Sequence, residues 1–132
     1  MATVYRFEEL KIWQDARRLA KMVFEITKNA PFNNDFRFRD QIRAASGSVM
    51  DNIAEGFERS SKLEFINFLS IAKGSSGETR SQLYRALDQK YTPTATALEL
   101  IKEYDSLASK ISTFISYLNQ DSVRGQKFKN RV

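Results

Sequence analysis

Apolar residues recur every three or four positions along four long stretches of this chain, which is the period of one face of an α-helix. The stretches cover approximately residues 7–29, 34–60, 61–91 and 92–118. The last of them keeps an apolar heptad pattern for about three heptads. Short connections between helices make successive helices antiparallel. The pattern predicts an all-α protein built as an antiparallel up-down-up-down four-helix bundle.

Local signals indicate where these helices begin. Asn34 and Asp35 are both good N-cap residues for the second helix, because their side-chain oxygens can accept a hydrogen bond from a free backbone N–H. Ser61 and Glu64 form the spacing of a capping box at the start of the third helix. Thr92 and Pro93 predict that the fourth helix has Thr92 as its N-cap and Pro93 at its first helical position.

Two absences restrict the chemistry of the protein. The 132 residues contain no cysteine and no histidine, which excludes disulfides, zinc sites built on these residues and a Ser-His-Asp triad. No apolar run approaches the roughly 20 residues that cross a bilayer, and the N-terminus does not resemble a signal peptide. We therefore expect a cytoplasmic protein with no catalytic site, no metal, no cofactor, no membrane contact and no small-molecule substrate.

Positive charge is concentrated at the C-terminus. The net charge is +5, from 21 basic and 16 acidic side chains. Residues 121–132 contribute +3, because Asp121 stands against four basic residues: Arg124, Lys127, Lys129 and Arg131. We expect a bundle domain at residues 1–120 and a basic tail at 121–132, which either binds phosphate groups or is only a solvated terminus.

Polar and small residues stand in the second and third helices where a plain bundle would have leucine. Five of them are candidates for a buried hydrogen-bond network, in which Arg43 or Arg80 pairs with Glu55 or Glu78: Arg43, Asn52, Glu55, Glu78 and Arg80. The alternative is that the two glutamates bind a metal or act as acid and base.

Three glycines in the middle of predicted helices need a reason of their own. Gly47, Gly74 and Gly77 each cost up to about 1 kcal/mol of helix stability relative to alanine. We expect them to permit a close approach between helix backbones.

Basic residues of the predicted bundle are candidates for binding nucleic acid. Arg37 and Arg39 alternate with Phe36 and Phe38, and such an alternation can stack bases and contact phosphates. The plainer interpretation is that the phenylalanines are core and the arginines are solvated. The candidates are Arg17, Arg18, Lys21, Arg37, Arg39, Arg59 and Lys62.

The first helix carries a second apolar stripe beside its main one. The main stripe contains Ile12, Ala16, Leu19, Val23, Ile26 and Ala30, and the second contains Leu10, Trp13, Ala20 and Phe24. A single bundle would leave one stripe exposed to water, so the pattern favours a homo-oligomer.

Several sequence strings resemble one known family. Residues 41–48, Gln-Ile-Arg-Ala-Ala-Ser-Gly-Ser, and residues 52–56, Asn-Ile-Ala-Glu-Gly, are similar to the signature of the proteins associated with 23S ribosomal RNA intervening sequences. Phe7, Leu10 and Trp13 resemble the opening of that family, and residues 65–75 resemble its third helix. The resemblance covers about residues 7–118. Gly47 departs from it, because a larger residue is expected there, and the basic tail lies outside it.

The resemblance implies a four-helix bundle that assembles as a ring-like homopentamer, without an established activity. Such bundles are similar to the accessory proteins of diversity-generating retroelements, which form basic pentamers that bind nucleic acid. The leading hypothesis is therefore a non-enzymatic oligomer that binds RNA or DNA through pooled basic surface. The alternatives are a protein–protein scaffold without a nucleic-acid role and, third, an enzyme that uses Glu55 and Glu78.

Overall fold

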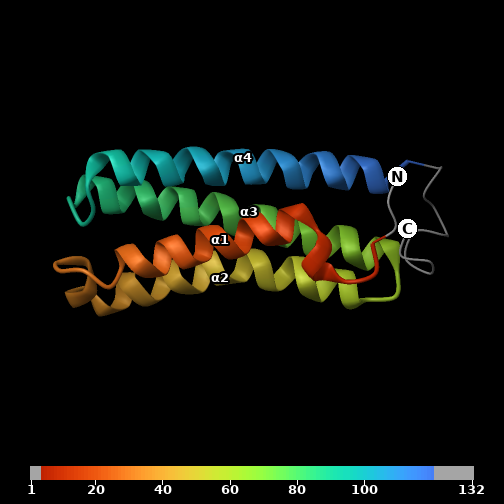
Figure 1. Cartoon of the computed structure of the whole chain (residues 1–132), viewed down its shortest axis with the longest axis horizontal. Coiled ribbons are helices and arrows are strands. Elements are labelled where there is room, and N and C mark those ends of the chain that lie inside the picture. Colours follow the sequence, from red (N-terminus) through yellow and green to blue (C-terminus); the bar gives the residue numbers. More distant parts are fainter. Residues whose placement is uncertain (1–3, 121–132) are drawn as a thin grey trace.

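A computed structural model describes residues 4–120, which fold into four α-helices and two short 3₁₀ helices. Successive α-helices run in opposite directions, so the predicted all-α, up-down-up-down bundle is confirmed (Figure 1). None of the described helices is long and apolar enough to span a membrane. The elements in chain order are η1 Phe7–Glu9, α1 Lys11–Ile26, η2 Phe32–Asn34, α2 Phe36–Glu58, α3 Lys62–Asp88 and α4 Thr94–Leu118.

Two of the predicted helix starts are confirmed, and the third is displaced. The Asp35 carboxylate accepts a hydrogen bond from the Phe38 N–H at 3.3 Å, and the Ser61 hydroxyl accepts one from the Glu64 N–H at 3.0 Å. The fourth helix begins one residue later than expected, with Pro93 in the N-cap position and without a side-chain cap. Thr92 is buried instead of capping the helix.

The helix α1 is shorter than the predicted 7–29. Leu10 has extended backbone geometry, with φ −75° and ψ 126°, and separates α1 from η1. The Gln14 side chain donates a hydrogen bond to the Glu8 carbonyl across this break at 2.8 Å. Trp13 packs its ring against Phe7 of η1, with centroids 5.1 Å apart. The chain therefore folds back at this point to cover Trp13 instead of continuing the helix.

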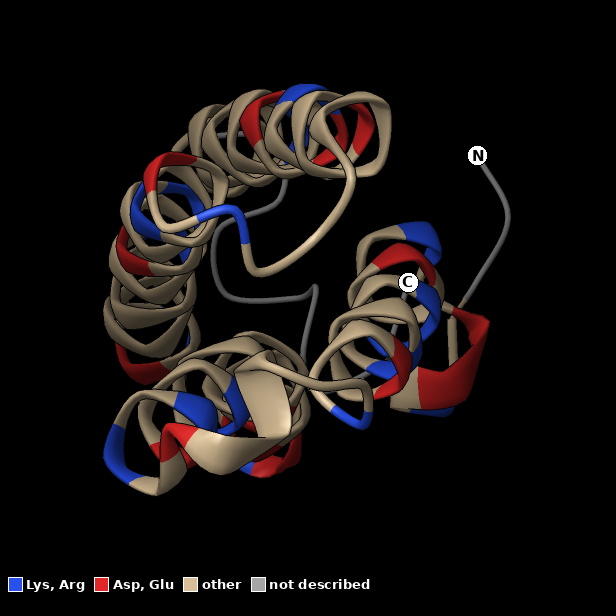
Figure 2. Cartoon of the chain, turned by 90° about the vertical axis from the view of Figure 1, so that its left-hand side faces the viewer, with Lys and Arg blue, Asp and Glu red and all other residues tan. Residues whose placement is uncertain are grey.

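The core lies along the common axis of the four helices and is mainly apolar, with a few buried polar side chains such as Ser46, Ser76 and Thr79 among the apolar ones. Each helix packs extensively on the next one along the chain, and among neighbouring helices α1 and α4 contact each other least (Figure 2). This leaves the α1–α4 side as the weakest seam of the bundle.

The second apolar stripe of α1 does not remain exposed as expected. Leu10 and Trp13 are only 6% and 8% exposed within the single chain, because η1 and the neighbouring helices cover them. Ala20 is half-buried, and only Phe24 is exposed. The stripe is therefore no argument for a second copy, and a homo-oligomer stays a prediction that needs other support.

The three mid-helix glycines do not bring helices together within the chain. A Cβ added at Gly47, Gly74 or Gly77 would meet no described atom within 4 Å, so the expectation of close approach inside the bundle is wrong. The close approach occurs at Gly56, where an added Cβ would lie 2.7 Å from the Phe68 Cβ.

One end of the bundle is closed by contacts between its two connections. The Tyr91 hydroxyl, between α3 and α4, donates a hydrogen bond to the second carboxylate oxygen of Asp35 at 2.8 Å. The rings of Phe32, Phe38 and Tyr91 lie 5.0 to 6.0 Å apart beside this bond. Asp35 therefore caps α2 and also joins the α1–α2 connection to the α3–α4 connection.

Candidate nucleic-acid interface

Three of the candidate basic residues lie together on the outer face of α1. Arg17, Arg18 and Lys21 line a surface groove of about 520 Å³ beside Trp13, and the acidic Glu8 of η1 also lines it. Trp13, Arg17 and Lys21 are spaced four residues apart and therefore share one helix face. The Arg17 guanidinium carbon lies 5.5 Å from the centre of the Trp13 indole.

The three cations of this groove differ in how their charge is balanced. Arg18 donates to the Glu103 carboxylate of α4 at 3.0 Å. Neither Arg17 nor Lys21 pairs with a carboxylate in the described part of the chain. These two exposed cations are the ones in the groove that can contact an external anion.

The start of α2 places the alternating aromatic and basic residues on different sides. Phe38 is core at 3% exposed, while Phe36 is 63% exposed with the Arg39 guanidinium carbon 5.0 Å from its ring centre. Arg39 also pairs with Asp40 at 3.0 Å. Arg37 is exposed and has no ion pair among residues 4–120. Of the two phenylalanines in this alternation, Phe38 therefore belongs to the core and Phe36 lies on the surface.

The turn between α2 and α3 holds a third group. Arg59 pairs with Glu55 at 2.9 Å and lies over the Phe68 ring at 5.0 Å, and Lys62 is half-buried. This turn is at the far end of α2 from Arg37, and a helix of 23 residues is about 35 Å long (Figure 1).

The candidate basic residues therefore do not form one patch on a single chain. Basic and acidic residues are interspersed on the helices, as Figure 2 shows. The four tail candidates lie outside the described residues: Arg124, Lys127, Lys129 and Arg131.

The predicted polar network is divided among separate local contacts. The Arg43 Nε donates to the Thr27 hydroxyl at 2.7 Å, and its guanidinium lies 4.2 Å from the Phe24 ring centre. Arg80 pairs with Asp105 of α4. Within the described chain, neither arginine pairs with Glu55 or Glu78.

The remaining members of that predicted network are also apart. The Asn52 amide donates to the backbone carbonyl and the hydroxyl of Ser48, both at 2.8 Å. Glu55 is exposed and held by Arg59, whereas Glu78 lies at the rim of a groove between α2 and α3. Among residues 4–120, no group of three acidic side chains is close enough to hold a metal ion.

Comparison with models of known protein families shows to which family the chain belongs. The model of the 23S rRNA-intervening sequence protein family matches residues 8–113, from η1 into α4. The chain belongs to the 23S rRNA-intervening sequence protein family. The resemblance of the signature strings is thereby confirmed.

A solved structure supports the fold of this 23S rRNA-intervening sequence protein. This chain is similar to the crystal structure of a protein with unknown function from the S23 ribosomal protein family of Bacteroides thetaiotaomicron VPI-5482. The two are 20% identical, the TM-score is 0.72, and the match covers 79% of this chain and 97% of the other. At this identity the likeness establishes the fold alone. A comparison with curated proteins finds no match.

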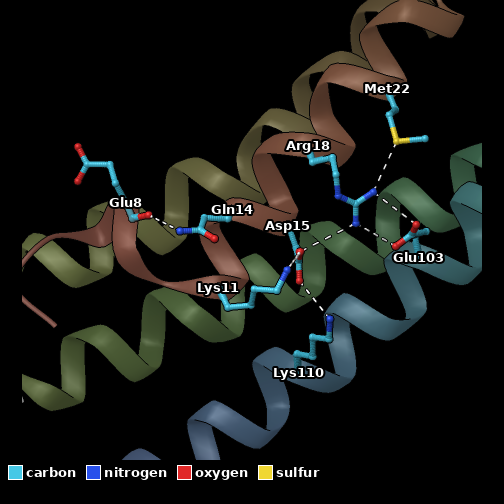
Figure 3. A network of polar contacts seen from close by, with 8 residues as sticks. All are labelled: Glu8, Lys11, Gln14, Asp15, Arg18, Met22, Glu103 and Lys110. Atoms are coloured by element: carbon cyan, nitrogen blue, oxygen red, sulfur yellow. Dashed lines mark hydrogen bonds and ion pairs between the residues drawn. The ribbon is translucent and has the colours of Figure 1, made fainter. Parts of the chain in front are cut away.

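A polar network that the sequence did not predict crosses the α1–α4 seam of the family member (Figure 3). Asp15 is 5% exposed and accepts from Lys11 Nζ at 2.9 Å and from Lys110 Nζ at 3.1 Å. Arg18 lies 3.9 Å from the same carboxylate and bridges to Glu103. Lys11 and Asp15 have helical spacing in the sequence, but Lys110 is 95 positions away, so only the fold could reveal the whole network.

The environment of Asp15 keeps it ionised. Burial opposes the charged form of this carboxyl, but hydrogen bonds from Lys11 and Lys110 outweigh burial and hold the pKa of Asp15 below its usual value. The network therefore links α1 to α4 with a buried negative charge that two cations neutralise.

Proposed function

We propose that this 23S rRNA-intervening sequence protein is a non-enzymatic homo-oligomer that binds RNA or DNA through basic surface pooled from several copies. The observation that carries the proposal is the groove on α1, where Arg17 and Lys21 are exposed beside Trp13 without a carboxylate partner. Cations that are not neutralised within the chain can release counterions from a phosphate backbone, and the free energy of binding then depends on salt.

Assembly is part of the proposal because one chain offers too few unpaired cations on one face. The basic groups of a single bundle are far apart, and each is weak alone. Copies arranged in a ring, for which the family resemblance implies a homopentamer, would place equivalent α1 grooves at one rim. Several weak phosphate contacts would then act together.

The mid-helix glycines support association between copies. Gly74 is exposed and Gly77 is half-exposed on α3, and an added Cβ at either would meet nothing described within 4 Å. Glycine in a helix costs about 1 kcal/mol relative to alanine, and no contact within the described chain offsets this cost. A close backbone approach by a second copy would account for it.

Charge reversal on α1 tests nucleic-acid binding. We expect Arg17→Glu with Lys21→Glu to weaken binding of a ribosomal RNA fragment more than tenfold at low salt, because two phosphate contacts become repulsive. Fluorescence anisotropy over a salt series would measure both the affinity and its salt slope.

The matched control changes the net charge of the protein by the same amount, but at two positions outside the α1 groove. Lys73→Glu with Lys102→Glu alters two exposed lysines on α3 and α4 that have no ion pair among residues 4–120. Equal losses in both double variants would mean that only net charge matters and that the α1 groove is not the site. No binding by the unaltered protein at low salt would refute the proposal itself.

A second candidate function is a protein scaffold without a nucleic-acid role. The observation that favours it is exposed apolar surface on α3, where Leu63 and Ile71 are 68% and 51% exposed. Native mass spectrometry with and without RNA separates the two functions. An oligomer that never retains RNA would favour the scaffold.

A further inference from the structure

The helix α1 ends and α2 begins at the same end of the bundle (Figure 1), and each carries an exposed phenylalanine there. Phe24 is 45% exposed and Phe36 is 63% exposed. A cation lies over one face of each ring: the Arg43 guanidinium carbon is 4.2 Å from the Phe24 centre, and that of Arg39 is 5.0 Å from the Phe36 centre. Both rings therefore combine open aromatic surface with a stacked guanidinium.

Both guanidinium groups are fixed by hydrogen bonds to the chain. Arg43 Nε donates to the hydroxyl of the buried Thr27 at 2.7 Å. Arg39 donates to the backbone carbonyl of Asn33 at 3.3 Å and to the Asp40 carboxylate at 3.0 Å. Their positions over the rings are thus set before any ligand arrives, which lowers the entropy that binding would cost.

The two rings share one side of the bundle. Phe36 and Arg43 are seven residues apart on α2, which is two turns on the same helix face and roughly 10 Å along the axis. Arg43 also lies on Phe24 of α1, so the surface runs from Phe36 through Arg43 to Phe24. We call this the Phe24–Phe36 surface.

Cations with free donors surround this surface. Lys28 Nζ lies 5.8 Å from the Phe24 ring centre and pairs with Glu25 at 3.3 Å, whereas Arg37 has no ion pair in the described chain. Arg43 donates only its Nε–H to a described partner, which leaves the N–H groups of both terminal nitrogens available. The surface therefore presents aromatic faces together with donors that suit phosphate oxygens.

We propose that the Phe24–Phe36 surface is a stacking platform for unpaired bases of single-stranded RNA or DNA. The inference rests on the nucleic-acid binding proposed above and specifies the kind of strand that is bound. Bases stack on the exposed surface of the Phe24 and Phe36 rings, while Arg37 and Arg43 contact the adjacent phosphates. Paired bases inside a duplex are already stacked and cannot reach the rings.

The charges around the rings favour nucleic acid over a protein partner. The centre of a protein–protein interface is depleted of charged residues. Here a cation lies over each exposed ring instead. Glu25 and Asp40 balance Lys28 and Arg39, which leaves Arg37 and Arg43 as the cations of this surface without a carboxylate partner in the described chain. A protein partner is the other outcome that the test distinguishes.

The test compares a single-stranded oligonucleotide that contains 2-aminopurine with the same sequence in a duplex. We expect Phe24→Leu and Phe36→Leu each to weaken single-strand binding roughly tenfold and to reduce the change in 2-aminopurine fluorescence on binding. Duplex binding should stay unchanged, which also demonstrates that the variants are folded. Tyr84→Leu is the matched control, because Tyr84 is 50% exposed on α3 with no cation over its ring in the described chain.

Three outcomes would overturn the inference, and they differ in what else they affect. Unchanged single-strand binding in both phenylalanine variants would remove the platform and leave the proposed function in place. No binding of either probe by the unaltered protein would remove both. Dissociation of the oligomer in the phenylalanine variants, measured by sedimentation, would assign the rings to a contact between proteins instead.

Discussion

Glycine has opposite roles at different residues of this bundle. At Gly56 the Phe68 side chain of α3 occupies the space where a Cβ would stand, so the residue must be small. At Gly74 the same atom would point into open space. Helical periodicity places both residues on helices but cannot give the distance to a neighbour, which is why the sequence predicted the wrong glycines for close approach.

Alanine at these two glycines should therefore change stability in opposite directions. We expect Gly56→Ala to lower the free energy of unfolding by about 1–3 kcal/mol, because Phe65 and Phe68 would have to move. Gly74→Ala should raise the intrinsic helix stability by up to about 1 kcal/mol. Urea unfolding monitored by circular dichroism would measure both, and equal effects of the same sign would contradict the assigned packing.

At the scale of elements, the helices were predictable, whereas the side-chain contacts between them were not. Local side-chain capping at Asp35 and Ser61 fixes the starts of α2 and α3, and such caps depend only on residues within one turn. The start of α1 was missed because packing of Trp13 against Phe7, a contact across a backbone break, replaces a helical turn. The Asp15 network was missed because it requires α4 beside α1.

Acid should weaken the bundle through Asp15. Its pKa is lowered in the folded chain, so its contribution is fully present above the unfolded value of about 4 and is lost as pH falls through the lower folded value. We expect Asp15→Asn to cost about 2 kcal/mol at neutral pH, because Lys11 and Lys110 lose a charged acceptor.

The pH dependence supplies the check on this prediction. Thermal unfolding from pH 7 down to pH 2 should converge for Asp15→Asn and the unaltered protein once the carboxyl is protonated in both states. Parallel curves across the whole range would show that Asp15 does not couple α1 to α4.

At the scale of the whole molecule, the sequence predicted the family and the architecture but not a functional surface. The basic candidates lie on three separate parts of the bundle: the α1 groove, the start of α2 and the turn between α2 and α3. Their order in the sequence does not show which of them share one face. Arg43 and Phe24 were assigned to a polar network and to an apolar stripe, and the fold stacks them on each other. Sites made from two helices depend on rotation and register, which only tertiary packing determines.

A leucine on the outer face of α3 tests assembly. Gly74→Leu should fit within one chain, since an added Cβ meets no described atom within 4 Å, yet it should block a close approach by another copy. We expect an at least roughly tenfold weaker association in sedimentation velocity. Ser106→Leu, at an exposed position of α4, should leave the association unchanged. An intact assembly in Gly74→Leu would exclude this face as the contact between copies.

The two oxygens of one carboxylate hold different parts of the same bundle end. Asp35 caps α2 with one oxygen and accepts a hydrogen bond from the Tyr91 hydroxyl on the other. The α1–α2 connection therefore cannot loosen there without also releasing the α3–α4 connection. Opening at this end is therefore a single joint event. The amides of the two connections should accordingly exchange with solvent deuterium at matched rates.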